Sequence, residues 1–269
     1  MDWEEIYKSK VVSPKEAILK LKSENHVAVG HAASEPRLLM KALVENKENF
    51  RNLKLYQMIA LGKSEYAKKG MEKHFSYNSL FVGGGTRDAV KDGRADYIPC
   101  FFSKIPRLFK ENYIKLDAAL IQVTPPDEHG FCSFGVSSDY IKPASECAKL
   151  VIAEVNDRMP RTLGDNFIHV SDIDYIVENS QDIIELKPPK IGKIERAIGE
   201  NCASLINDGD VLQLGIGAIP DAVLLFLKDK KDLGIHSEMI SDGVVELVEA
   251  GVINNKKKTL HKGKIIVSF

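Results

Sequence analysis

The sequence predicts an α/β fold made of two similar, open, mostly parallel domains, the second of them truncated. Two observations support this. Apolar strand-like segments alternate with helical segments along the chain, and one strand, glycine turn and helix plan occurs twice. A length of 269 residues suits two domains of roughly 150 residues each. The prolines in residues 187–190 resist both helix and sheet, so we expect domains at 1–187 and 188–269.

The composition is that of an ordinary soluble protein, with 44% hydrophobic and 28% charged residues. A net charge of -1 gives no electrostatic reason to expect nucleic acid or an anionic membrane as a partner. We expect neither a signal peptide nor a membrane span, because the N-terminus is acidic and no apolar run approaches about 18 residues. The four cysteines are far apart, which favours reduced thiols and a cytoplasmic location. Small molecules are the expected partners.

The first half opens with a capped helix. Ser13, Pro14 and Glu16 form a capping-box pattern, and the helix is expected to continue through Leu21. A strand at residues 26–29, a turn at Gly30, a helix at 37–44 and a strand at 53–58 should follow.

Further strands are expected at residues 79–82, 116–124, 149–155 and 173–177. The glycines at 83–85 would follow the first of these, and three successive glycines imply close approach of the backbone to another part of the protein. Asp127, Glu128 and His129 are acidic or imidazole side chains, but they lack metal-ligand spacing, so a turn is favoured over a metal site.

The second half repeats the plan of the first. A helix at residues 194–206 precedes a strand at 211–214, a turn at Gly215, a helix begun by Pro220 and a strand at 233–239. Gly30 corresponds to Gly215, Pro36 to Pro220, and Met58 falls near Glu238. The chain ends within an expected strand at 265–269. We therefore expect either a fragment or a second polypeptide that completes this domain.

The apolar segment after the glycine turn and helix ends in a carboxylate, so Glu238 is expected at the carboxyl end of a neighbouring parallel strand, where open α/β sheets bind ligands. The glycine turn beside it first suggests a dinucleotide site. The third glycine of that motif is here Pro220, which disfavours a nicotinamide cofactor. Two simpler interpretations stay open: the glycines make only a tight turn, and the glutamate is only solvated.

Two other polar residues are candidates for the site. Gln213 lies within the apolar segment at 211–214, so it is expected to be either a structural clamp or a hydrogen-bond donor to substrate. His31, after Gly30, is expected to reach the same cleft from the first domain. The alternative for His31 is a histidine satisfied at a strand end.

Taken together, these motifs resemble the family I coenzyme A transferases, in the acetyl-CoA hydrolase/transferase branch that includes 4-hydroxybutyrate and butyrate:acetate CoA-transferases. Members of the family are longer, so the resemblance implies that the C-terminal portion is lacking here. The matching motifs are residues 30–36, 81–87, 95–99, 125–135, 214–220 and 236–243.

The resemblance implies that Glu238 is the active-site glutamate, which takes CoA as a glutamyl thioester in a ping-pong transfer between a short-chain acyl-CoA and a free carboxylic acid. Gln213 is a candidate oxyanion donor and His31 a candidate wall of the cleft. CoA enters as a substrate, with no tightly bound cofactor and no metal. A homodimer is expected. The CoA-binding loop would comprise Gly215, Ile216, Gly217, Ala218 and Ile219.

Three other functions remain as alternatives: an acyl-CoA hydrolase, a CoA-binding fragment without turnover, and a nucleotide-dependent oxidoreductase. The first differs from a transferase only in the access of water to the intermediate, and the last is disfavoured by Pro220.

Overall fold

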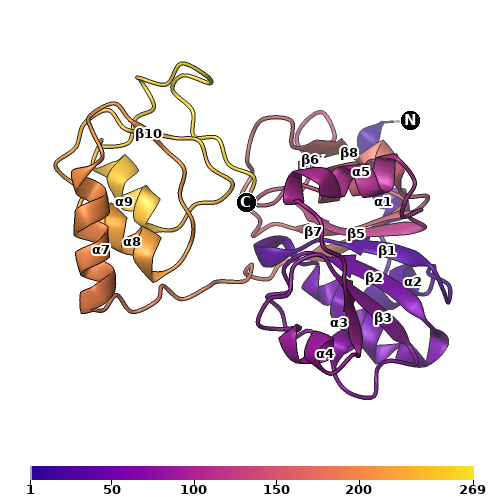
Figure 1. Ribbon diagram of the computed structural model, residues 1–269. Coiled ribbons are helices and arrows are strands. Elements are labelled where there is room, and N and C mark those ends of the chain that lie inside the picture. The colour runs from indigo at the N-terminus through magenta and orange to yellow at the C-terminus, as the bar shows by residue number, and fades with distance from the viewer. Residues whose placement is uncertain (1) are drawn as a thin grey trace. The chain divides into compact units, whose positions relative to one another are not determined.

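The computed structural model describes residues 2–269 and divides them into two compact units (Figure 1). Unit 1 ends at Glu185 and unit 2 begins at Leu186. The change between units falls two residues before the boundary expected from the prolines at 187–190.

Unit 1 is built on a seven-stranded sheet in which every neighbouring pair is parallel. Chain order runs outward from the centre in both directions, so the topological switch point lies between β1 and β5, as in doubly wound α/β folds. The predicted parallel α/β fold is therefore confirmed. The spatial order is β4 (Ala95–Tyr97), β3 (Phe75–Ser79), β2 (Leu53–Gln57), β1 (His26–Val29), β5 (Ala118–Val123), β7 (Val151–Asn156) and β9 (Tyr175–Asn179).

Helices cover both faces of this sheet (Figure 1). Successive side chains of a strand point to opposite faces, so Val27 and Val29 pack in the core beneath α2 and α3, whereas Ala28 packs in the core beneath α5 and α6. The helices of unit 1 are α1 (Trp3–Lys10), α2 (Pro14–Ile18), α3 (Arg37–Glu45), α4 (Arg87–Lys91), α5 (Ile105–Lys110) and α6 (Ile141–Cys147). Short 3-10 turns lie at η1 (Ala32–Ser34), η2 (Lys47–Asn49), η3 (Glu65–Ala67), η4 (Phe102–Lys104) and η5 (Val170–Asp172).

A small antiparallel pair, β6 (Phe131–Ser133) and β8 (Phe167–His169), lies outside the main sheet. The fully buried strand predicted at 116–124 is β5, and all six of its side chains are buried.

The capping box at the start of α2 is confirmed. Ser13 Oγ accepts from the Glu16 backbone N–H at 3.3 Å, and the Glu16 carboxylate accepts from the Ser13 backbone N–H at 2.9 Å. The helix ends at Ile18, earlier than predicted.

The strand predicted at 79–82 is wrong, because β3 runs from Phe75 to Ser79. Buried and half-buried residues alternate along β3. Its half-buried positions are polar, so the strand contains no continuous apolar run that would predict it. Of the three glycines that follow, Gly85 makes a close approach within its own unit: a Cβ there would lie 2.9 Å from the carbonyl oxygen of Ala60 and 2.7 Å from Ser64 Oγ.

Unit 2 carries the second strand, turn and helix plan on a smaller sheet. Its two strands, β10 (Val211–Leu212) and β11 (Gly234–Ile235), are parallel and shorter than the segments predicted at 211–214 and 233–239. The strand predicted at 265–269 contributes a single bridge between His236 and Ile266.

The helices of unit 2 pack closely against each other. A Cβ on Gly199 would lie 2.7 Å from the backbone of Ala222, so this glycine allows two helices to approach. Leu224, Ile235 and Val244 are members of the core of the unit. The helices are α7 (Lys193–Ser204), α8 (Ala218–Leu225) and α9 (Gly243–Glu249).

Candidate functional site

A surface pocket of about 360 Å³ lies at the carboxyl ends of β10 and β11. The two strands are parallel, so the segments that follow them leave from the same edge of the sheet. The structure thus brings together three of the predicted site residues, Gln213, Gly215 and Glu238. The pocket is lined by Gln213, Leu214, Gly215, Glu238 and Met239.

Glu238 lies three residues beyond the end of β11, and its side chain is exposed. The carboxylate makes no hydrogen bond or ion pair with any residue from 2 to 269. Its backbone is held instead: the Glu238 carbonyl oxygen accepts from the backbone N–H groups of Ser268 at 2.9 Å and Phe269 at 3.1 Å. Within residues 2–269 the carboxylate is therefore unpaired, whereas its backbone is held by hydrogen bonds.

The glycine turn leads directly into α8. Gly217 has a φ of 121° and a ψ of -178°, a conformation that is essentially restricted to glycine. Helix α8 begins at Ala218, so the prediction that Pro220 begins it is wrong by two residues. Pro220 still lies within the first turn, where its missing N–H removes no helical hydrogen bond.

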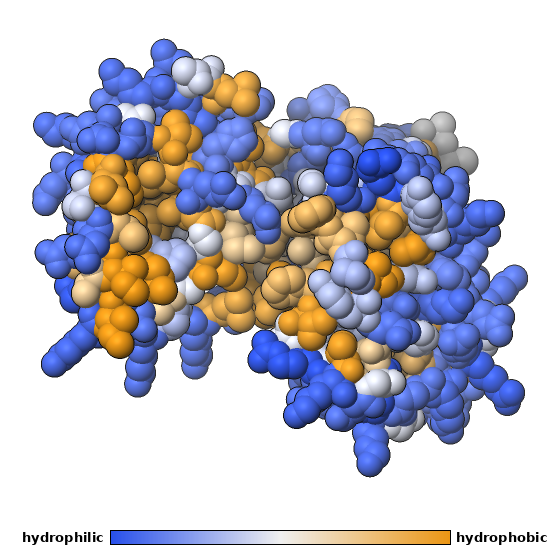
Figure 2. Space-filling model, viewed as in Figure 1, coloured by the Kyte–Doolittle hydropathy of each residue, from blue (hydrophilic) through white to orange (hydrophobic). Residues whose placement is uncertain are grey.

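The expected CoA-binding loop is therefore part turn and part helix. Ala218 and Ile219 belong to the first turn of α8, where backbone N–H groups have no partner within the helix and the helix dipole is positive. Apolar side chains also reach the surface of unit 2 (Figure 2). In the loop itself, Ile216 is 49% exposed and Ile219 is 45% exposed.

The prediction that Gln213 lies inside an apolar strand is wrong. Strand β10 ends at Leu212, and the Gln213 side chain is exposed in the pocket rather than buried. A buried amide would need partners within the protein, but an exposed amide can donate to a ligand.

His31 lies in unit 1 and is fully buried. Its Nε2 donates to Asp139 Oδ2 at 2.6 Å, and Ser137 Oγ donates to the same oxygen at 2.7 Å. Burial alone would raise the pKa of Asp139, but the attraction of His31 and these hydrogen bonds hold that pKa below its ordinary value. This arrangement corresponds to the alternative interpretation, a histidine satisfied at the end of a strand.

Sequence reasoning missed Ser237. Its side chain is 8% exposed, and its hydroxyl makes two hydrogen bonds of 2.9 Å to the backbone of Leu214. The sequence shows Ser237 only as a polar residue beside Glu238 in the motif at 236–243.

Asp127 shapes the proline-flanked loop in unit 1. Its Oδ1 accepts from the backbone N–H groups of His129 and Phe131, both at 2.9 Å, and its Oδ2 accepts from Arg161 at 2.6 Å. The hydrogen bond from Phe131 is the main reason why the pKa of Asp127 is below its ordinary value. The side chain therefore forms a turn.

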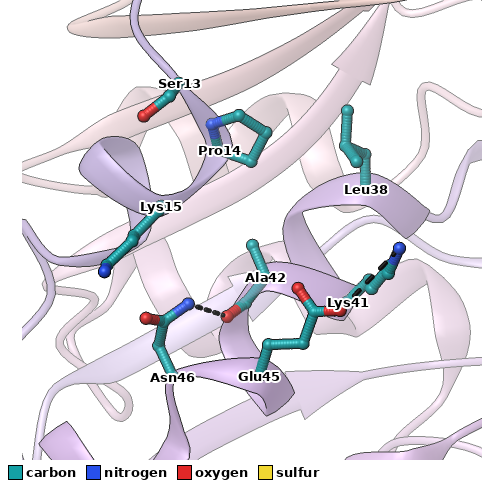
Figure 3. A pocket seen from close by; sticks show the side chains of 8 residues that line it. All are labelled: Ser13, Pro14, Lys15, Leu38, Lys41, Ala42, Glu45 and Asn46. Carbon is teal, nitrogen blue, oxygen red and sulfur yellow. Dashed lines mark hydrogen bonds and ion pairs between the residues drawn. The ribbon is translucent and has the colours of Figure 1, made fainter.

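A second surface pocket, of about 260 Å³, lies between α2 and α3 of unit 1 (Figure 3). Some of its polar side chains are paired locally: Asn46 Nδ2 donates to the Ala42 carbonyl at 2.8 Å, and Lys41 lies 3.7 Å from the Glu45 carboxylate. None of the predicted site residues lines it.

Within residues 2–269, no group of three or more His, Cys, Asp or Glu side chains is arranged to hold a metal ion. Over the same range, none of the helices has both the length and the apolar character that a bilayer crossing requires.

Comparison with known proteins defines the class. Residues 1–188 match the acetyl-CoA hydrolase/transferase N-terminal domain, so the chain belongs to this family. It is 67% identical over 269 residues to the 4-hydroxybutyrate coenzyme A transferase of Clostridium kluyveri, matching all of this chain and 63% of that protein. It is 33% identical to the butyryl-CoA:acetate CoA-transferase of Anaerostipes caccae, over 100% of this chain and 62% of that protein.

Solved structures agree. The 4-hydroxybutyrate CoA-transferase of Porphyromonas gingivalis matches with a TM-score of 0.88 and 42% identity, and RipA of Yersinia pestis matches with a TM-score of 0.95 and 33% identity. Both alignments cover the whole of this chain, with 64% of the first structure and 65% of the second. The chain thus spans just under two thirds of the length of these relatives.

Proposed function

We propose that this protein is a CoA-transferase that moves CoA between a short-chain acyl-CoA and a free carboxylic acid, with Glu238 as the nucleophile. One observation carries the proposal: an exposed carboxylate that makes no hydrogen bond within residues 2–269 shares a pocket with the glycine turn that leads into α8. A carboxylate engaged in an ion pair would be less nucleophilic. A carboxylate without a neighbouring binding site for CoA could not receive the CoA group.

The substrate class follows from the relatives. The high identity to a protein named for 4-hydroxybutyrate favours a C4 hydroxy acid, and the other relatives named above extend the class to butyrate and acetate.

The first half of the reaction consumes the acyl-CoA. The Glu238 carboxylate attacks the thioester carbonyl, and the carbon–sulfur bond breaks. CoA is released as a thiolate, and a mixed anhydride between Glu238 and the acyl group remains. The thiolate then attacks the glutamyl carbonyl of the anhydride. The acid is released as its carboxylate, and Glu238 carries CoA as a thioester.

The second half reverses these steps with another acid. An incoming carboxylate attacks the glutamyl thioester, which regenerates an anhydride and the CoA thiolate, and the thiolate attacks the new acyl carbonyl. The products are the new acyl-CoA and the free Glu238 carboxylate. One thioester replaces another, so the exchange needs no outside source of energy.

The turn and the start of α8 suit the binding of CoA in this mechanism. The backbone N–H groups of Ala218 and Ile219 are donors at a positive helix end, and Ile216 and Ile219 offer exposed apolar surface to the pantetheine arm. Gln213, on the pocket wall, is the side chain proposed to donate to the oxyanion of each tetrahedral intermediate. His31 is enclosed by its own unit, so we assign it to holding the loop after β1.

Hydrolysis is the second candidate function. Glu238 is exposed in the described chain, so water can reach a glutamyl thioester formed there. A hydrolase would release free CoA without an acceptor acid, whereas a transferase would wait for one.

Steady-state kinetics test the proposal. With 4-hydroxybutyryl-CoA and acetate as substrates, the 269-residue chain should give parallel double-reciprocal lines, and Glu238→Ala should reduce transfer to background. Full activity in Glu238→Ala would overturn the assignment of the nucleophile. Release of CoA at the same rate without acetate would establish the hydrolase instead. A homodimer, completion by a second chain and a cytoplasmic location stay predictions from the sequence.

A further inference from the structure

The hydrogen-bond ladder of unit 2 changes character just before Glu238. The His236 backbone N–H donates to the Leu212 carbonyl at 3.0 Å, which is an ordinary rung of a parallel pair. The next rung would use the backbone N–H and C=O of Leu214. Both groups bind one side chain instead: the Leu214 N–H donates to Ser237 Oγ at 2.9 Å, and Ser237 Oγ donates to the Leu214 carbonyl at 2.9 Å.

We propose that Ser237 is a positioning residue, whose hydroxyl replaces a backbone rung so that the two strands separate by a fixed amount and hold Glu238 opposite the Gly215 turn. The proposal rests on the proposed function of Glu238. A backbone rung at this step would draw residues 214 and 238 together in the ladder. With the hydroxyl between them, the pocket lined by Gln213, Gly215 and Glu238 begins at this step.

The surroundings of Ser237 fit this role rather than a direct one in the chemistry. The side chain is 8% exposed, and its one proton and a lone pair are both used by Leu214. On its other side, the Ser237 backbone N–H donates to the Ile266 carbonyl at 2.9 Å. The residue is thus held between two segments and has no free donor for a ligand.

Unit 1 uses a comparable device at the corresponding place in the repeat. Gln57 precedes Met58 as Ser237 precedes Glu238, and its Nε2 donates to the Gly30 carbonyl at 2.8 Å. In both units, therefore, a polar side chain at the end of the second strand or two residues beyond it binds the backbone that follows the first strand.

The experiment compares four chains in a single turnover with 4-hydroxybutyryl-CoA: unchanged, Ser237→Ala, Ser237→Cys and Ser237→Thr. Intact mass follows the covalent CoA adduct. Displacement of a nucleophile by about 1 Å costs about 100-fold in rate, so Ser237→Ala should lower the limiting rate by about that factor. The acyl-CoA concentration for half-maximal rate should change less than about twofold, because the CoA-binding loop is intact. Threonine retains the hydroxyl and should restore the rate.

Cysteine covers the case in which the alanine variant does not fold. A thiol is a weak donor and acceptor of nearly the same shape, so Ser237→Cys should give an intermediate rate. Ser204→Ala is the matched control, because it also removes a hydroxyl that donates to a backbone carbonyl of unit 2, at 2.7 Å, but on α7. It should react as the unchanged chain does.

Hydrogen exchange at the Leu214 amide tests the positioning role of Ser237 separately from the proposed role of Glu238 as nucleophile. This amide should be protected in the unchanged and threonine chains and should exchange rapidly in Ser237→Ala. If no adduct forms in the unchanged chain, the proposed function and the positioning role both fail. If the adduct forms at the unchanged rate in Ser237→Ala, the positioning role alone is overturned.

Discussion

The turn after β1 in unit 1 and the turn after β10 in unit 2 follow one plan but end in opposite states. In unit 1 the side chains that follow the strands are buried and bound to one another, as the His31–Asp139 pair shows. In unit 2 the turn opens on a pocket, and Glu238 makes no side-chain hydrogen bond within residues 2–269. The strand, turn and helix plan thus supplies a location for chemistry, and the polar side chains at the strand ends decide whether that location is filled or left open.

The switch point of the large sheet illustrates the filled state. Ligands of doubly wound sheets bind at the carboxyl ends of strands beside such a point. Here Gln122, at the end of β5, donates to the Glu35 carbonyl at 2.9 Å and accepts from Asn156 at 2.8 Å. All three residues are buried. In unit 1, the protein's own side chains therefore fill the carboxyl ends of the strands beside the switch point, where ligands usually bind.

The largest loss of stability is expected for His31→Ala, which tests the buried pair in unit 1. The substitution leaves the Asp139 carboxylate buried without the imidazole that pairs with it, which should lower the free energy of unfolding by about 3–5 kcal/mol. Urea denaturation measures it, with His129→Ala at an exposed histidine as the control. If His31→Ala keeps its stability but loses CoA transfer, the His31–Asp139 pair does not stabilise unit 1. His31 would then act directly on the substrate.

The next effect concerns Glu154, which accepts from the backbone N–H groups of Leu38 and Leu39 at the start of α3. Burial raises its pKa from 4.5 to about 7, despite these hydrogen bonds. The folded state therefore retains a proton that the unfolded chain has released. The stability from this group is complete below pH 4.5 and is lost as the pH rises through about 7, by about 3 kcal/mol.

Glu154→Gln removes that titration. The unfolding free energy of the unchanged chain should therefore fall relative to that of Glu154→Gln between about pH 4.5 and 8. Denaturation at several pH values checks this, and a constant difference between the two chains would show that the strand end of β7 is less enclosed than the structure indicates.

A smaller effect is expected at Gly217. Alanine at its backbone angles costs about 1–3 kcal/mol, so Gly217→Ala should destabilise unit 2 or rearrange the turn. Gly215→Ala is the matched control, because a Cβ there would meet only Pro220 at an ordinary 3.5 Å. Equal losses in the two variants would show that the open turn does not depend on the conformation of Gly217.

Gln213→Ala should have the smallest effect on stability, within about 0.5 kcal/mol, because the side chain is exposed. If Gln213 donates to the oxyanion, the same variant should slow adduct formation by about 100- to 1,000-fold. A rate equal to that of the unchanged chain would remove Gln213 from the mechanism.

Local patterns made much of the fold predictable. The capping box at Ser13 and the buried strand β5 depend on neighbouring residues and were predicted correctly. Strand β3 was placed wrongly because its polar positions alternate with buried ones, as in Phe75 and Ser76.

The site was predictable only in part, since its geometry depends on residues far apart in the sequence. His31 and Asp139 are separated by 108 positions, so the pair that buries His31 leaves no local pattern. The role proposed for Ser237 depends on where two strands separate, which no periodicity reveals. Glu238 and the glycine turn could be predicted together because each follows an apolar segment, and the carboxyl ends of neighbouring parallel strands lie at one edge of a sheet.

The most direct test of the account is to trap the intermediate on the chain itself. Incubation with 4-hydroxybutyryl-CoA followed by borohydride should reduce a glutamyl thioester to an alcohol, and peptide mass spectrometry should place that change at Glu238 alone. Protein treated with borohydride without acyl-CoA should be unmodified. Reduction at another residue, or no reduction in a chain that still transfers CoA, would contradict the assignment of Glu238 as the nucleophile.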